Sequence, residues 1–62
     1  MSNADIKLCF QLIDLEQLKM DSFPVNSYHY WDCQLSRDTI MRVLAALLGQ
    51  PIEKLAEIRK LI

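Results

Sequence analysis

The chain has 62 residues, of which 52% are hydrophobic, and its formal net charge is −1. A chain of this length forms one domain, here residues 1–62, and buries only roughly 60% of the surface that its unfolded form exposes. A deep active-site cleft is therefore not expected. Ordering costs roughly 1.5 kcal/mol per residue, so a fold this small needs a disulfide, a metal or a partner chain for support. We expect a partner chain.

The two cysteines can form at most one disulfide, and no basic, signal-like stretch precedes them. The longest apolar run, Val43 to Leu48, is too short to span a bilayer. We therefore expect a soluble cytoplasmic protein with no membrane contact and with both thiols reduced and buried. Seven basic residues are offset by eight acidic ones, which disfavours nucleic acid as a partner.

The N-terminal stretch Ala4 to Met20 has two interpretations. With a period of about 3.6 residues, Lys7, Gln11 and Asp14 form one polar stripe and most of the rest is apolar, which predicts a helix. With a period of two, Ile6 to Leu12 alternates between apolar and polar residues as in a half-buried strand. We prefer the helix. The alternative is an α+β domain with an N-terminal strand.

The segment between Asp21 and Gln34 is the only part of the chain predicted to lack a helix. Pro24 restricts the residue before it to an extended conformation, and Asn26 and Ser27 are typical turn residues. The following run, Tyr28 to Trp31, is rich in strand-forming residues. It predicts a short extended aromatic segment.

Two helices joined by a tight turn are predicted at the C-terminus. Ser36 is a good N-cap for a helix from about Arg37 to Leu48, and Gly49 stands where a glycine would end it. Pro51 suits the first position of a second helix that runs to about Leu61. We predict a predominantly α fold, with a C-terminal helix-turn-helix hairpin and a core of Ile40, Val43, Leu44, Leu47, Leu55 and Ile58.

No group of residues demands a particular chemistry. His29, Cys33 and Cys9 would supply three ligands to a metal, without a convincing fourth. A reactive thiolate needs an electropositive setting, and Cys33 instead follows the carboxylate of Asp32. We expect no catalytic residue, no metal and no cofactor.

The candidate contacts with a partner are aromatic and aliphatic. Tyrosine and tryptophan are enriched at interface hot spots, and the first predicted C-terminal helix carries an apolar arc of about 160° at roughly 100° per residue, wider than one buried face needs. The candidates are Tyr28, Tyr30, Trp31, Met41, Leu44 and Leu48. We predict a non-enzymatic interaction module that forms a homodimer or acts as a subunit or regulator by binding a larger protein.

Two resemblances suggest an alternative. An extended segment followed by two helices, Tyr28 to Ile62, is similar in layout to ribbon-helix-helix regulators, which implies a dimer that reads DNA from paired strands. Of the side chains that such a ribbon would present here, only Gln34 is an ordinary reader of base edges. Leu48 to Leu55 resembles the turn before the last helix of phage-repressor-type helix-turn-helix domains, without a recognition helix before it. The alternative function is therefore a dimeric DNA-binding regulator or antitoxin.

Overall fold

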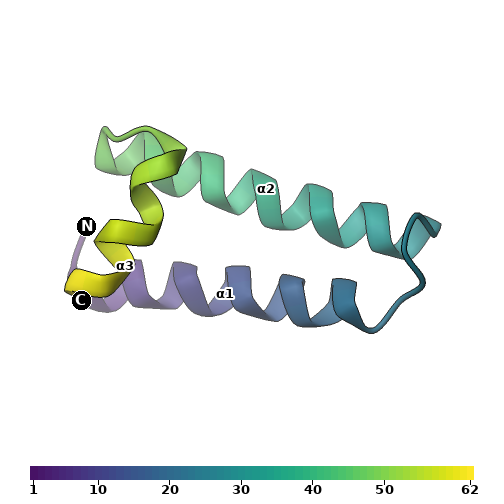
Figure 1. Ribbon diagram of the computed structural model, residues 1–62. Coiled ribbons are helices and arrows are strands. Elements are labelled where there is room, and N and C mark those ends of the chain that lie inside the picture. The colour runs from purple at the N-terminus through teal and green to yellow at the C-terminus, as the bar shows by residue number, and fades with distance from the viewer.

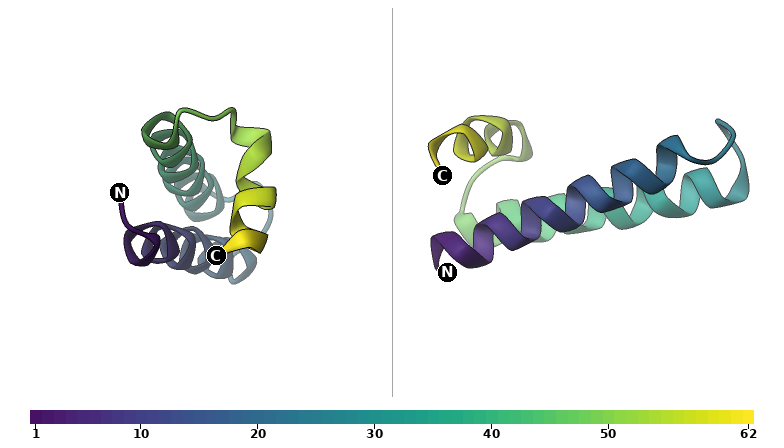
Figure 2. Two further views of the ribbon diagram at one scale, coloured as in Figure 1. Left: turned by 90° about the vertical axis from the view of Figure 1, so that its left-hand side faces the viewer. Right: turned by 90° about the horizontal axis from the view of Figure 1, so that it is seen from below.

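Helices account for most of the computed structural model, which describes all 62 residues: α1 (Asn3–Asp21), α2 (Tyr28–Leu48), a 3-10 turn η1 (Ile52–Lys54) and α3 (Leu55–Leu61). The long helices α1 and α2 lie side by side as an antiparallel hairpin (Figure 1). Figure 2 shows the short α3 across one side of that hairpin, at the end that holds both chain termini. The predominantly α fold is confirmed, and the alternative N-terminal strand is not present.

The start of α1 is set by a capping box. The Ser2 hydroxyl accepts a hydrogen bond from the Asp5 backbone N–H at 3.2 Å, and the Asp5 carboxylate accepts one from the Ser2 backbone N–H at 3.3 Å. These bonds satisfy N–H groups that have no partner inside the helix. Ile6, Phe10 and Ile13, spaced as one helical face, then turn inward and are buried. The helical interpretation of the N-terminal stretch is therefore correct.

The predicted extended segment is wrong, because α2 begins at Tyr28 rather than at Arg37. Ser27, not Ser36, is the N-cap: its hydroxyl accepts from the Tyr30 backbone N–H at 3.2 Å. Asn26 precedes it with a φ of 67°, a left-handed conformation that asparagine tolerates well. Since no strand is present, the ribbon expected from the ribbon-helix-helix resemblance is absent from this structure.

Packing against α1 explains why α2 is so long. Aromatic residues lose only a few tenths of a kcal/mol in a helix relative to better helix formers, which tertiary contacts easily outweigh. Cys33, in the second turn of α2, is buried, and so is Met20 at the end of α1 that the loop joins to α2. A helix that began only after Ser36 would lose the contacts made by its first two turns.

The predicted turn at Gly49 is confirmed. Gly49 has a φ of 65° and its N–H donates to the Ala46 carbonyl at 3.1 Å, while the Gln50 N–H donates to the Ala45 carbonyl at 3.0 Å. This pair of bonds is a Schellman motif, which ends a helix on a left-handed residue. Pro51 is extended, with a ψ of 153°, so the next helical turn begins one residue later than predicted, as η1, and continues as α3.

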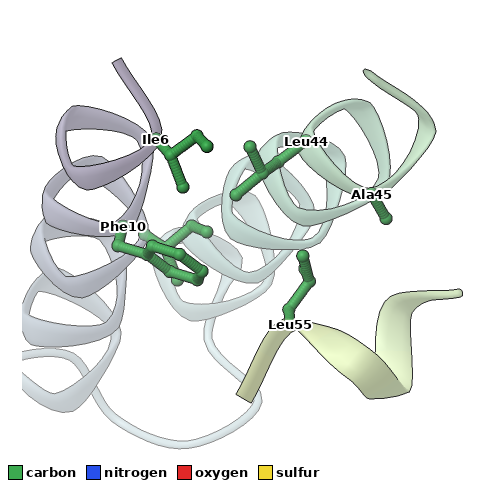
Figure 3. Close-up of a cluster of buried hydrophobic side chains, with 6 residues drawn as sticks. Ile6, Phe10, Leu44, Ala45 and Leu55 are labelled. Atoms are coloured by element: carbon green, nitrogen blue, oxygen red, sulfur yellow. The ribbon is translucent and has the colours of Figure 1, made fainter. Parts of the chain in front are cut away.

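The hydrophobic core joins all three helices at the end near the termini. Figure 3 shows Ile6 and Phe10 of α1 pointing toward Leu44 of α2, with Leu55 of α3 closing the cluster. Of the predicted core residues, Leu44 and Leu55 are buried, and Ile40 and Ile58 pack against the cluster from its margin. Val43 and Leu47 were wrongly assigned to the core, since they are 54% and 64% exposed. The inner side chains of α1 take their place.

Candidate interaction surface

The six predicted contact residues do not form one surface. Tyr28 and Trp31 are exposed, at 79% and 51%, and Tyr30 is half-buried. Met41 and Leu48 are half-buried against the core. Leu44 is only 1% exposed and fills the space between the helices, so it packs within the protomer and presents no surface. The candidates thus divide between the first turn of α2 and the core at its other end.

The aromatic residues gather where the loop enters α2. The His29 ring stacks on Phe23, with ring centroids 4.9 Å apart, and Tyr30 and Trp31 meet edge to face at 5.4 Å. Trp31 also borders a depression of about 200 Å³ next to Gln34, whose side-chain oxygen is buried without a hydrogen-bond partner. Phe23, Val25, Tyr28 and Trp31 leave large apolar areas exposed here. We call these four residues the aromatic end.

A second apolar surface was not predicted from the sequence. Leu8 and Leu12 of α1 are 54% and 43% exposed, and Val43 and Leu47 of α2 are 54% and 64% exposed. Each pair is spaced four residues apart, so its two members lie one above the other on their helix. We call these four residues the open face.

The open face lies on the side of the hairpin away from α3. On α1, the side toward α3 is marked by Phe10 and Asp14, which both contact Arg59. Leu8 and Leu12 each lie two residues earlier, about 200° around the helix at 100° per residue. On α2, the side toward α3 is marked by Met41 and Ala45, which pack with Leu55. Val43 and Leu47 each follow two residues later, again about 200° away.

Both pairs consequently face away from α3, which covers one side of the hairpin only (Figure 2). The signal in the sequence was the second apolar stripe of the N-terminal helix, Leu8, Leu12 and Leu15, opposite Ile6, Phe10 and Ile13. A helix that is apolar on two faces needs cover on both. Only the packing of α2 and α3 tells which of the two stripes is left outside.

An ion pair holds α3 on its side of the hairpin. The Arg59 guanidinium donates to the Asp14 carboxylate, with one N···O distance of 2.8 Å, and lies 5.2 Å from the centroid of the Phe10 ring. The hydrogen bond from Arg59 lowers the pKa of Asp14, more than partial burial raises it, and the same bond raises the pKa of Arg59. Both side chains remain about half exposed, so the pair orients α3 rather than forming a reactive site.

The structure contains no arrangement that would hold a metal ion, since nowhere do three His, Cys, Asp or Glu side chains come together suitably. Its surface depressions have volumes of 200 to 230 Å³, below the 300 Å³ or so at which ligand pockets begin. Cys9 and Cys33 are both free thiols. The structure therefore offers two candidate contact regions, the open face and the aromatic end.

None of the helices has the length and apolar character required to cross a bilayer. Comparison with known proteins gives no match to a family model, to a curated protein or to a solved structure.

Proposed function

We propose that this chain is a small non-enzymatic interaction module, which works by burying its open face against another protein chain in a homodimer or a larger complex. The observation that carries the proposal is the position of Leu8, Leu12, Val43 and Leu47 on one uncovered side of the hairpin. Large side chains grouped in this way, rather than scattered singly, mark interaction sites on small soluble domains.

The shape of the protomer supports shared burial. Its accessible surface is 4482 Å², whereas a compact monomer of 7.2 kDa exposes about 4100 Å². Its radius of gyration is 12.2 Å, against about 10.6 Å for a compact domain of 62 residues. Eight residues alone are buried, and none of them is polar. A chain with so little core gains stability by covering apolar surface in a complex.

The aromatic end supplies a second contact region in this proposal. Trp31 is half exposed and held edge to face by Tyr30, which leaves a rigid apolar surface available to a partner. Replacing Trp31 with alanine is expected to weaken association by more than about 1 kcal/mol if it is a hot spot. The two free thiols, Cys9 and Cys33, support a reducing compartment, and we propose the cytoplasm.

The proposal can be tested with a photo-reactive amino acid placed in the full-length chain inside the producing cell. Position 47 lies on the open face, and position 18 lies on α1, outside both the open face and the aromatic end, with the same exposure of 64%. We expect light to join position 47 to one defined protein chain, either a second copy or another protein, and to leave position 18 without a defined product. Equal labelling at both positions, or no defined product at either, would contradict a role for the open face.

A further inference from the structure

We propose, resting on the function just proposed, that the occupant of the open face is a second copy of this chain. The two hairpins pack face to face around a twofold axis parallel to α1 and α2. Their long helices then form an antiparallel four-helix bundle, with each α3 on the outside. Three properties of the open face support a second copy: its register, its charges and its area.

The register of the hairpin makes the open face complementary to itself. The hydrogen bond between Gln17 and Arg37 places these residues at one level of the antiparallel pair. With the same rise of about 1.5 Å per residue in both helices, Leu8 is level with Ala46 and Leu12 with Arg42. Leu47 and Val43 are the next residues along α2, so each leucine of α1 lies within one residue of the level of its counterpart. A twofold axis along the hairpin preserves these levels and sets α1 against α2 of the other copy. Leu8 and Leu12 then meet Leu47 and Val43 of the second copy, which is the symmetry of an isologous interface.

Charge does not oppose this arrangement. Beyond Leu12, the same edge of α1 continues with Glu16 and Lys19, which neutralise each other through an ion pair of 3.2 Å. By the same register, Glu16 and Lys19 are level with Asp38 and Leu35. Asp38 lies about 140° around α2 from Val43, at 100° per residue, so it does not face the second copy. The residues next to these levels on the Val43 side are Thr39 and Ser36, four and seven residues before Val43, and both are uncharged. No charged residue of one copy is thereby forced against a like charge of the other. The apolar contact has a polar rim, as stable interfaces do.

The long side of the hairpin that carries the open face approaches the area that a stable dimer buries. The protomer measures 34 × 18 × 16 Å, so one long side has a footprint of about 600 Å² before side-chain relief is added, near the roughly 800 Å² that each partner buries in a standard interface. The net charge of −1 per chain produces little repulsion between two copies. Helices of 19 and 21 residues also match in length when one hairpin lies on another.

The first test measures molecular mass by sedimentation equilibrium from 1 µM to 500 µM. We expect the wild-type chain to reach twice 7.2 kDa, and its melting temperature to rise with concentration, because a folded dimer is favoured by mass action. Leu47→Lys should raise the dissociation constant at least 100-fold, whereas Leu35→Lys, equally exposed on another side of α2, should leave it unchanged. Val43→Asn serves as a milder second variant if Leu47→Lys does not fold.

The second test determines the orientation of the two copies by disulfide trapping, in a background where Cys9 and Cys33 are alanine. A mixture of Leu12→Cys and Val43→Cys chains should give the mixed disulfide in preference to either symmetric one. Leu35→Cys chains should form no more disulfide-linked dimer than random collision in solution produces. A preference for the Leu12→Cys pair with itself would overturn the twofold axis proposed here.

The outcomes separate this inference from the proposed function. A wild-type chain that remains monomeric to 500 µM, with position 47 still joined to another protein in the cell, overturns the second copy and leaves the interaction module standing. A monomer with no defined product at position 47 overturns both. If the chain dimerises and neither Leu47→Lys nor Val43→Asn weakens the dimer, the interface lies elsewhere. That result overturns the open face as the dimer interface.

Discussion

Asp14 of α1 and Arg59 of α3 form an ion pair across 45 positions of the chain, and the same guanidinium lies over the Phe10 ring. Phe10 is buried in the core, and Asp14 follows it one helical turn later. Arg59 therefore fixes where the short α3 rests on α1. Because α3 occupies this side of the hairpin, the other side is the one left uncovered.

The Asp14–Arg59 pair should make stability depend on pH in the acid range. The pKa of Asp14 lies below its ordinary value of 3.8 in the folded chain, chiefly because of the hydrogen bond from Arg59. The unfolded chain then binds more protons than the folded chain in this range. The contribution of the ion pair to the free energy of unfolding is therefore present above about pH 4, and it is lost as the pH falls through the pKa that Asp14 has in the folded chain. Since both groups are half exposed, it amounts to less than about 1 kcal/mol at pH 7.

Asp14→Asn should remove that contribution. Thermal unfolding followed by circular dichroism should be measured from pH 2 to pH 7. The melting temperatures of wild type and variant should converge at low pH and separate above pH 4. The double variant Asp14→Asn/Arg59→Gln isolates the coupling between the two residues. If the difference in melting temperature between wild type and Asp14→Asn stayed constant across this pH range, the ion pair would not be the source of the pH dependence.

The two serines that could cap α2 are expected to differ in their effect on stability. Ser27→Ala removes the hydroxyl that accepts from the Tyr30 N–H and should lower the free energy of unfolding by about 0.5 to 2 kcal/mol. Ser36→Ala lies inside the helix, where alanine is the better helix former, and should change it by less than about 0.5 kcal/mol. Urea unfolding of both variants measures this, and a larger loss for Ser36→Ala would contradict the observed start of α2.

The buried position of Leu44 leads to a third prediction. Leu44→Ala should destabilise the chain by about 2 to 5 kcal/mol, because a cavity remains where the side chain joined α1 to α2. Leu35→Ala, on the same helix but 64% exposed, is the matched control and should cost less than about 0.5 kcal/mol. Comparable losses in denaturant unfolding would show that Leu44 does not fill the core.

The helix end at Gly49 should tolerate asparagine better than alanine. No atom lies within 4 Å of a Cβ added there, so the effect of a side chain comes from the left-handed φ of 65° alone. Gly49→Ala should therefore lower stability by about 1 kcal/mol, and Gly49→Asn by less. The two midpoints of urea unfolding, measured side by side, test the order, and an alanine variant as stable as wild type would contradict it.

The sequence by itself determined the features that depend on neighbouring residues. The apolar period of the N-terminal stretch indicated a helix, and Gly49 marked the end of α2, because both signals rest on local spacing and on hydrogen bonds within one or two turns. Leu44 and Leu55 were recognised as core residues for the same reason, since both lie on the inner face of stretches that were correctly predicted to be helical.

Only the tertiary structure decided between signals of equal local strength. Ser27 and Ser36 are equally good caps, and the choice depends on whether residues 28–36 can pack on α1. α1 has two apolar stripes and α2 a wide arc, so which residues turn inward depends on where the other helices lie. With α3 held at Asp14, Phe10 was buried, and Leu8, Leu12, Val43 and Leu47 were left on the open face.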